Sequence, residues 1–148
     1  MAARYALVLD DDAPLRALVR DALTAEGWTV GCFPRNEAAM HLASRRQPDV
    51  VMLDISQPEF APEALAAGLR IHYGPDLPIL ATATTPQLDM VRRIQPYSFL
   101  AKPFELERLV QLLEKGRNLS ERSARLRAHS ESALDRMRSL RTSSSQDA

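Results

Sequence analysis

The sequence predicts an α/β fold in which a parallel sheet carries helices on both faces, and three observations support this. Apolar runs alternate with amphipathic stretches over about 115 residues, which gives five strand–helix units. The runs at 5–9 and 50–53 are continuously apolar, as in strands buried on both faces. Both stop at an aspartate, Asp10 and Asp54, which puts carboxylates at the ends of buried strands.

The first half of the chain contains three predicted strands and two predicted helices. Gly27 stands where a helix commonly ends, and Asn36 can cap the helix that follows the second strand. In chain order the elements are a strand at 5–9, a helix at 15–23, a strand at 28–33, a helix at 38–42 and a strand at 50–53.

The second half continues the alternation. Pro78 introduces the fourth strand. Thr85 is expected to be the N-cap of the next helix, with Pro86 at its first helical position. In chain order the elements are a helix at 63–73, a strand at 79–82, a helix from 85 to 94, a strand at 99–101 and a helix at 106–113.

Right-handed crossovers leave few windings for five such units. We expect the flavodoxin-like strand order 2-1-3-4-5, whose switch point lies between strands 1 and 3. These are the two strands that end in aspartate. The predicted fold class is therefore α/β, a flavodoxin-like (βα)5 doubly wound parallel sheet, with a helical C-terminal extension.

Composition excludes several classes of protein. With 19 basic and 19 acidic residues the net charge is zero, so no global basic field favours nucleic acid. The single cysteine, Cys32, excludes an internal disulfide and fits a reducing compartment. No apolar run is long enough to cross a bilayer and no signal peptide is present, so we expect a cytoplasmic protein without membrane contact.

The last thirty residues differ from the rest. Gly116 is expected to interrupt the final helix, and Asn118 with Glu121 resembles a capping box that starts another. One series of positions spaced by seven is apolar throughout. A coiled coil also needs a second apolar series between them, the alternate core row, and here that second series is poor in apolar residues. That apolar row consists of Leu112, Leu119, Leu126, Ala133 and Leu140. The predicted divisions are a domain at 1–116, a helical extension at 117–141 and a disordered tail at 142–148.

The residues at the strand ends suggest a magnesium and phosphoryl site. Magnesium prefers a few carboxylates together with waters and phosphate oxygens. Asp11, Asp54 and the backbone carbonyl of Ser56 could supply such ligands, with Asp10 behind them as an acceptor that orders water or Asp11.

The same site supports phosphoryl transfer. Asp54 can attack phosphorus and become an acyl phosphate, because this reaction needs positioning and charge neutralisation more than covalent chemistry from the protein. Lys102 would supply a second positive charge opposite the metal, and the hydroxyl of Thr82 could donate to a phosphoryl oxygen.

Four motifs carry a family resemblance. They are Leu-Val-Leu-Asp-Asp-Asp at 7–12, Pro-Asp-Val-Val-Met-Leu-Asp at 48–54, Pro-Ile-Leu-Ala-Thr-Ala at 78–83 and Phe-Leu-Ala-Lys-Pro-Phe at 99–104. In this order and separation they resemble the receiver domain of bacterial two-component response regulators, over roughly residues 4–115.

The resemblance implies roles for individual residues. Asp54 is similar to the phosphoacceptor, Asp10 and Asp11 to the acidic metal pair, and Lys102 to the family's lysine. Phe99 falls at the switch aromatic, and the bond from Lys102 to Pro103 is expected to be cis.

One departure leaves the hydroxyl position open. Pro78 lies one residue closer to Thr82 than is usual, so Ala83 or Thr84 could occupy that position instead. Alignment from Asp54 favours Thr82.

The resemblance implies a stand-alone regulator, similar to the chemotaxis regulator, that is not an enzyme beyond phosphotransfer and autodephosphorylation at Asp54. Its partners would be a histidine kinase or phosphotransfer protein, an unknown downstream protein and a second copy of the chain. Two rivals stay open: a receiver-like scaffold that is not phosphorylated, and a flavodoxin-like enzyme or small phosphatase.

Overall fold

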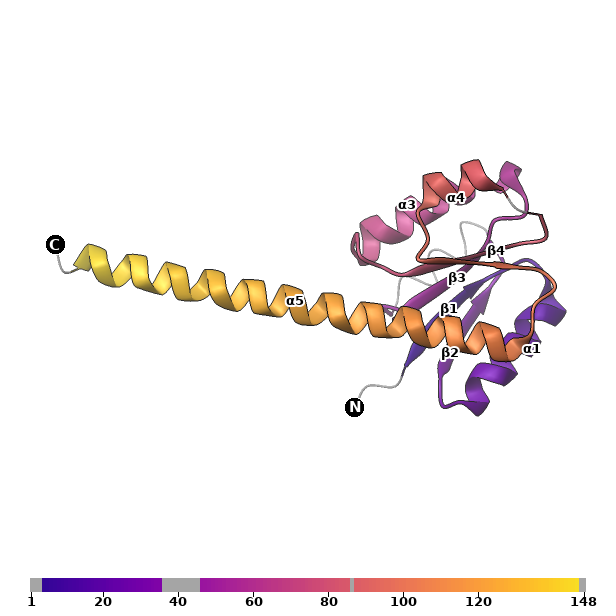
Figure 1. The fold of residues 1–148 in the computed structure, drawn as a ribbon, viewed down its shortest axis with the longest axis horizontal. Coiled ribbons are helices and arrows are strands. Elements are labelled where there is room, and N and C mark those ends of the chain that lie inside the picture. Colours follow the sequence, from indigo (N-terminus) through magenta and orange to yellow (C-terminus); the bar gives the residue numbers. More distant parts are fainter. Residues whose placement is uncertain (1–3, 36–45, 86, 147–148) are drawn as a thin grey trace.

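The computed structural model describes residues 4–35, 46–85 and 87–146 of the 148-residue chain. Five parallel strands form one sheet in the order β2-β1-β3-β4-β5, which confirms the predicted winding (Figure 1). The strands are β1 (Tyr5–Leu9), β2 (Thr29–Phe33), β3 (Val50–Asp54), β4 (Ile79–Ala83) and β5 (Ser98–Ala101).

Helices cover both faces of this sheet. They are α1 (Ala13–Ala25), α3 (Pro62–Tyr73), α4 (Leu88–Ile94) and α5 (Leu106–Gln146), and a 3-10 turn, η1 (Pro58–Phe60), follows β3. The helix expected at 38–42 and its cap Asn36 lie outside the described residues.

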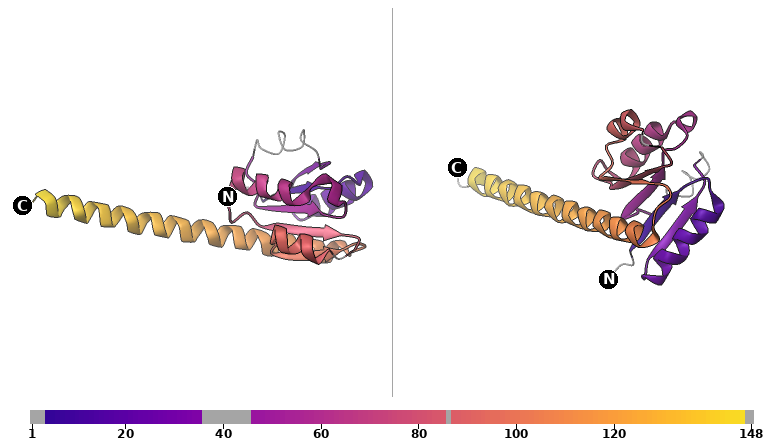
Figure 2. Two further views of the ribbon diagram at one scale, coloured as in Figure 1. Left: turned by 90° about the horizontal axis from the view of Figure 1, so that it is seen from above. Right: turned by 45° about the vertical axis from the view of Figure 1, so that its right-hand side comes forward.

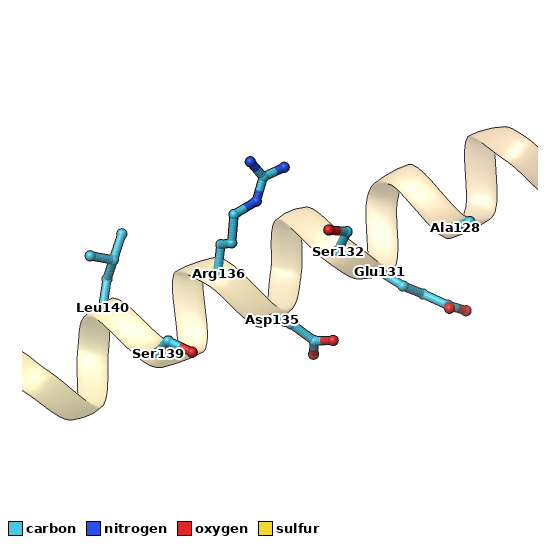
Figure 3. A pocket seen from close by; sticks show the side chains of 7 residues that line it. All are labelled: Ala128, Glu131, Ser132, Asp135, Arg136, Ser139 and Leu140. Atoms are coloured by element: carbon cyan, nitrogen blue, oxygen red, sulfur yellow. The ribbon is translucent and has the colours of Figure 1, made fainter.

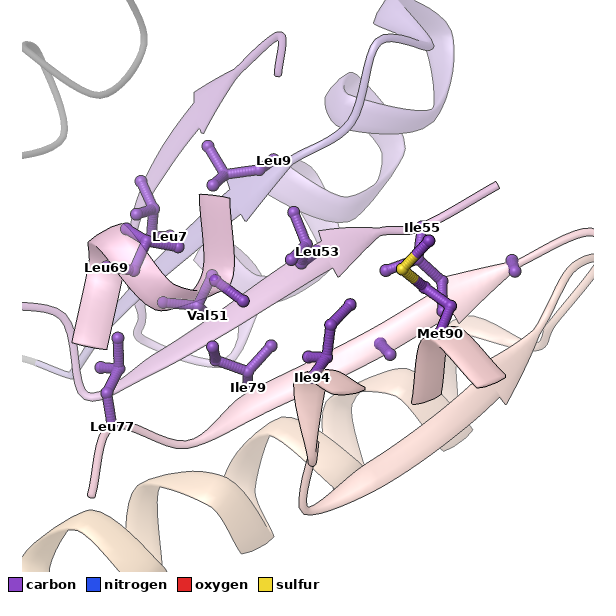
Figure 4. Packing of buried hydrophobic residues seen from close by; sticks show 13 residues of the cluster. Leu7, Leu9, Val51, Leu53, Ile55, Leu69, Leu77, Ile79, Met90 and Ile94 are labelled. Atoms are coloured by element: carbon purple, nitrogen blue, oxygen red, sulfur yellow. The ribbon is translucent and has the colours of Figure 1, made fainter. Parts of the chain in front are cut away.

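Alternate residues of the buried strands point to opposite faces, and each face has its own hydrophobic core. Leu53 and Ile79 belong to the core under α3 and α4 (Figure 4). Val8 and Met52 belong to the core under α1 and α5. Because β1, β3 and β4 are buried along their whole length, both faces had to be apolar, as the continuous runs predicted.

Parallel pairing brings the carboxyl ends of the strands to one edge. The register places Leu9 beside Leu53 and Asp54 beside Thr82. The residues that follow β1 and end β3 therefore face the same edge of the sheet.

The start of α4 differs from the prediction. Thr85 was expected to cap this helix, whereas it begins at Leu88 with Gln87 at the N-cap. The Gln87 side chain instead donates to the backbone carbonyl of Ser56 at 3.1 Å, so the residues before α4 belong to the loop that faces β3.

The expected interruption at Gly116 is also absent, since α5 is one helix of 41 residues. A Cβ at position 116 would lie 2.6 Å from Cγ2 of Val50 and 2.7 Å from the hydroxyl oxygen of Tyr97. Glycine is therefore needed for close packing of the helix on the sheet, and it does not end the helix.

Beyond Gly116 the helix still contacts the loop before β4, where Nη1 of Arg127 lies 4.0 Å from Oδ2 of Asp76, and then projects into solvent (Figures 1 and 2). It reaches Gln146, so residues 142–146 are helical where a disordered tail was expected. The predicted extension at 117–141 is the outer part of this helix. Among the described residues no helix is long and apolar enough to cross a membrane.

Candidate functional site

Charged side chains from three strand ends meet at the carboxyl edge of the sheet. Asp10 follows β1, Asp54 ends β3 and Lys102 follows β5. Nζ of Lys102 lies 2.7 Å from Oδ2 of Asp10 and 3.4 Å from Oδ2 of Asp54. Because the two aspartates are only 1% and 5% exposed, Lys102 stabilises two buried carboxylates with one charge. The next bond, from Lys102 to Pro103, is cis as expected.

The three consecutive aspartates have separate tasks. Asp10 is the innermost, and its Oδ1 accepts from the backbone N–H of Asp12 at 2.9 Å. Asp12 caps α1, since its Oδ1 accepts from the N–H of Leu15 at 3.1 Å. Asp11 lies between them, and its carboxylate accepts hydrogen bonds from Arg35. Arg35 follows β2 and also binds the end of β3.

Ser56 fixes the carboxylate of Asp54. Oδ1 of Asp54 accepts from the backbone N–H of Ser56 at 3.0 Å and from its hydroxyl at 2.6 Å. The Ser56 hydroxyl oxygen also accepts from the N–H of Thr84 at 3.2 Å. The loop after β3 is thereby joined to the end of β4, and Oδ2 of Asp54 is left facing the cations.

Arg35 is the second cation of the site, and it was not predicted. Its Nη2 lies 2.9 Å from Oδ2 of Asp11 and 3.8 Å from Oδ2 of Asp54. Its Nη1 donates to the backbone carbonyl of Asp54 at 2.7 Å, and its side chain is 1% exposed. The guanidinium therefore lies between the two carboxylates that the sequence assigned to a metal.

Arg35 also sets the ionisation of Asp11. Partial burial would raise the pKa of Asp11, but the backbone N–H and guanidinium of Arg35 hydrogen-bond to its carboxylate. These bonds and the charges of Arg35 and Arg16 outweigh burial, so the pKa of Asp11 is lowered and the carboxylate stays ionised.

Sequence reasoning missed Arg35 because the residue contacts the site only through the fold. It follows β2, which neighbours β1 in the sheet, and it reaches Asp54 nineteen residues away. A usable signal was present: a basic residue two positions after the end of β2, the strand that neighbours β1 at the switch point.

Of the two hydroxyl residues considered for the site, Thr82 lies in β4 and Thr84 follows it. Thr82 is fully buried beside Asp54 in the register, and no described residue forms a hydrogen bond with its hydroxyl. Thr84 is exposed and follows the strand. Phe99 is half-buried against the core under α3 and α4, next to Ala81 in the register.

The donor set fits magnesium in kind but not in its present arrangement. Asp11, Asp54 and the carbonyl of Ser56 offer the oxygens that magnesium prefers. Each of these groups already has a protein partner: Arg35 for the carboxylates and Gln87 for the carbonyl. In the described parts of the chain no three His, Cys, Asp or Glu side chains are grouped as a metal site.

A separate hollow lies along the outer part of α5, away from the acidic site (Figure 3). Its lining comes from one exposed helix alone, so it is an open surface that does not enclose a small ligand. The lining residues are Ala128, Glu131, Ser132, Asp135, Arg136, Ser139 and Leu140.

Comparison with known proteins gives a single family. Residues 6–114 match the response regulator receiver domain. The chain is 29% identical to the DNA-binding transcriptional regulator NtrC of Proteus hauseri over 111 residues, which are 73% of this chain and 23% of that protein. It is 33% identical to the probable transcriptional regulatory protein TcrX of Mycobacterium tuberculosis over 107 residues, 70% of this chain and 45% of that protein.

A third relative matches beyond the domain. The C4-dicarboxylate transport transcriptional regulatory protein DctD of Rhizobium meliloti is 33% identical over 140 residues, which are 90% of this chain and 30% of that protein. A match of that coverage includes much of the projecting part of α5. The chain spans less than half the length of each of these curated relatives.

Solved structures agree with the fold. A response regulator receiver protein from Sinorhizobium medicae is 27% identical with a TM-score of 0.68, covering 80% of this chain and 97% of that one. The chemotaxis protein CheY4 of Vibrio cholerae is 24% identical with a TM-score of 0.68, covering 77% of this chain and 98% of that one.

Proposed function

The chain belongs to the family of response regulator receiver domains, and from this premise we propose that Asp54 is the residue that accepts the phosphoryl group. The observation that carries the proposal is the position of its carboxylate. Asp54 is almost fully buried at the switch point of the sheet, with Oδ2 3.4 Å from Nζ of Lys102.

The proposed donor is a phosphohistidine of a histidine kinase or phosphotransfer protein. A carboxylate oxygen of Asp54 forms a bond to phosphorus while the bond from phosphorus to the donor imidazole breaks, and the donor recovers its nitrogen lone pair. The charge on the phosphoryl oxygens would be stabilised by Lys102, and Ser56 holds the other carboxylate oxygen in place.

Magnesium is the proposed cofactor, held by Asp11, Asp54 and the carbonyl of Ser56. When bound there it would neutralise charge on the carboxylates and the incoming phosphoryl group. The oxygen donors support this, and Arg35 would have to leave its present position. Hydrolysis of the acyl phosphate at Asp54 is the accompanying autodephosphorylation; the family is otherwise not one of classical enzymes.

Thr82 is the proposed link from the phosphoryl group to the surface. Its buried hydroxyl forms no hydrogen bond within the described part of the chain, and Thr82 neighbours Asp54 in the register, so a new acceptor beside Asp54 would give this hydroxyl a partner. Phe99 is proposed to respond through the adjacent strand. The signal would then leave through α4, β5 and α5 by protein contact.

The proposal is tested by mass spectrometry after incubation with acetyl phosphate and magnesium. The wild type should gain one phosphoryl mass, and Asp54→Asn should gain none. Asp76→Asn, which changes an exposed carboxylate on the loop before β4, is the matched control and should label as the wild type does. Labelling of Asp54→Asn would show that another residue accepts the phosphoryl group.

The two rival functions are not equally supported. The family match gives no support to a flavin enzyme or small phosphatase. A scaffold that is never phosphorylated would have the same fold, and it is the outcome if the wild type does not label. The intact set of Asp10, Asp54 and Lys102 favours phosphorylation, because a scaffold has no need of buried charges.

We also propose a homodimer formed through the outer part of α5. From 124 to 142 the helix is exposed except at Ala133, and a mostly polar helix is marginal in water without a partner. Leu112, the first residue of the apolar row at seven-residue spacing, is buried in the domain core, so a second copy would cover the outer residues of the row, from Leu119 to Leu140. The downstream protein target is not identified by any of these residues.

A further inference from the structure

We propose that Arg35 is a tethered cation that occupies the metal position of the acidic pocket, so that a divalent cation competes with it for Asp11 and Asp54. The inference rests on the proposed function, since it concerns the same pocket. It adds that the chain carries its own competitor for the metal.

Several hydrogen bonds fix Arg35 in the acidic pocket. Both carboxylate oxygens of Asp11 accept hydrogen bonds from Arg35: Oδ1 from the backbone N–H at 2.7 Å and Oδ2 from Nη2 at 2.9 Å. Nη1 donates to the carbonyl of Asp54 at 2.7 Å. A guanidinium and a divalent cation repel each other, so they cannot share this position between the two carboxylates.

The loop after β3 holds the guanidinium from the other side. Oε1 of Gln57 accepts from Nη2 of Arg35 at 3.1 Å. The ring of Phe60, half-exposed in η1, lies 5.2 Å from the guanidinium carbon, within the range of a cation–π contact. Arg35 therefore joins the acidic pocket to a surface loop that begins at Gln57, directly after Ser56.

The hold on Arg35 is incomplete. Among the described residues its buried Nε–H has no hydrogen-bond partner, so within that part of the chain the closed arrangement leaves one donor unsatisfied. An arginine that leaves the pocket recovers the hydration of that group, which makes release available when a divalent cation competes.

Release would change the loop as well as the pocket. Without the guanidinium, Gln57 loses a hydrogen-bond donor and Phe60 loses its cationic partner. Binding of a divalent cation is therefore coupled to the conformation of residues 57–60, and Arg35 sets the metal concentration at which the pocket becomes ready for phosphorylation.

The test measures binding of Mn²⁺ by electron paramagnetic resonance of the free ion, with no phosphodonor present. Arg35→Gln should lower the Kd for Mn²⁺ at least about fivefold, a typical size for coupling between competing ligands. Arg20→Gln, which removes an exposed arginine on α1, is the control for net charge and should leave the Kd unchanged. Asp54→Asn should weaken binding, because the ion then loses a ligand.

A second variant separates competition from a general charge effect. Phe60→Ala keeps every charge but removes the ring that holds Arg35, so it should also lower the Kd, by a smaller factor than Arg35→Gln. An Arg35→Gln variant that binds Mn²⁺ no more tightly than the wild type overturns the inference. A Phe60→Ala variant with an unchanged Kd also overturns it, because tighter binding by Arg35→Gln alone would then be a general charge effect.

The outcome is independent of the test of phosphorylation. A wild type that labels at Asp54 while Arg35→Gln binds Mn²⁺ no more tightly overturns the inference and leaves the proposed function standing. Tighter binding of Mn²⁺ by Arg35→Gln in a protein that never labels supports the inference and contradicts the proposed function.

Discussion

Two buried carboxylates share Lys102, so the stability of the pocket depends on that residue. Lys102→Ala would leave Asp10, which is 1% exposed, without its cation. We expect the free energy of unfolding to fall by about 3 kcal/mol, as for a buried pair that loses one partner. Urea denaturation measures this, with the exposed Lys115→Ala as the control.

The same substitution distinguishes pairing from packing. Asp10→Asn in the Lys102→Ala background removes the unpaired charge and should recover part of the lost stability. A double variant no more stable than Lys102→Ala would show that the lysine acts through its apolar stem. Labelling by acetyl phosphate should be slower in Lys102→Ala in either case, because Lys102 is proposed to stabilise the transferred group.

The hydroxyl of Thr82 gives a second prediction at the residue scale. Thr82→Ala should still accept phosphate at Asp54, but the NMR signals of Phe99 should no longer shift on addition of beryllofluoride. Thr82→Ser keeps the hydroxyl and should retain the shift. If Thr84→Ala abolishes the shift and Thr82→Ala does not, the exposed threonine is the one that contacts the phosphoryl group.

At the scale of elements, the strands could be predicted closely and the helix ends less so. Tyr5–Leu9 has the predicted bounds, because an unbroken apolar run is buried as a whole. The start of α4 could not be predicted, since Gln87 is committed to the carbonyl of Ser56, a contact between segments 31 residues apart. Gly27 was interpreted correctly as the glycine after a helix, with a φ of 86°.

Gly116 shows why the same residue type can have opposite meanings. In an exposed helix Gly→Ala stabilises by about 1 kcal/mol. Here a Cβ would overlap Val50 and Tyr97, whose hydroxyl donates to the carbonyl of Leu112 at 2.7 Å. Nothing in the local sequence distinguishes a helix break from a site of close packing, so this contact had to be seen in the fold.

We predict that Gly116→Ala lowers the free energy of unfolding by about 1–3 kcal/mol, in spite of its better helix propensity. Thermal and urea denaturation measure the change. Gly116→Ala in a Tyr97→Ala background, where the obstructing ring is gone, should cost less than in the wild type. A more stable Gly116→Ala would mean that α5 can move away from the sheet without loss.

At the scale of the whole molecule, the winding and the acidic site followed from the sequence, whereas the contents of the site did not. Strand order is restricted by crossover handedness. Asp10, Asp54 and Lys102 lie at strand ends, so their positions do not depend on the conformation of the loops. Arg35 enters the site from a loop, and only the completed fold brings a loop residue to a defined point.

The projecting part of α5 is where association of two chains is expected. Leu126 and Leu140 are 61% and 70% exposed and belong to the row of apolar residues spaced by seven, while Leu134, 52% exposed, lies off that row. Leu126→Glu and Leu140→Glu should therefore disrupt a dimer formed through the row, and Leu134→Glu is the matched control of equal charge. The inner part of α5 stays with the domain through Leu109 and Leu113, so these variants should fold normally.

Light scattering measures the outcome against a chain mass of 16.5 kDa. The wild type, alone or after addition of beryllofluoride, should give twice that mass at high concentration, and so should Leu134→Glu. The single variants Leu126→Glu and Leu140→Glu, each of which adds one charge as Leu134→Glu does, should give the monomer mass in both conditions. Because the alternate core row contains Ser123 and Ser130, we expect the dimer to be weak and to depend on concentration. A wild type that is monomeric in both conditions would contradict self-association, and the exposed row would then be a surface for a different protein.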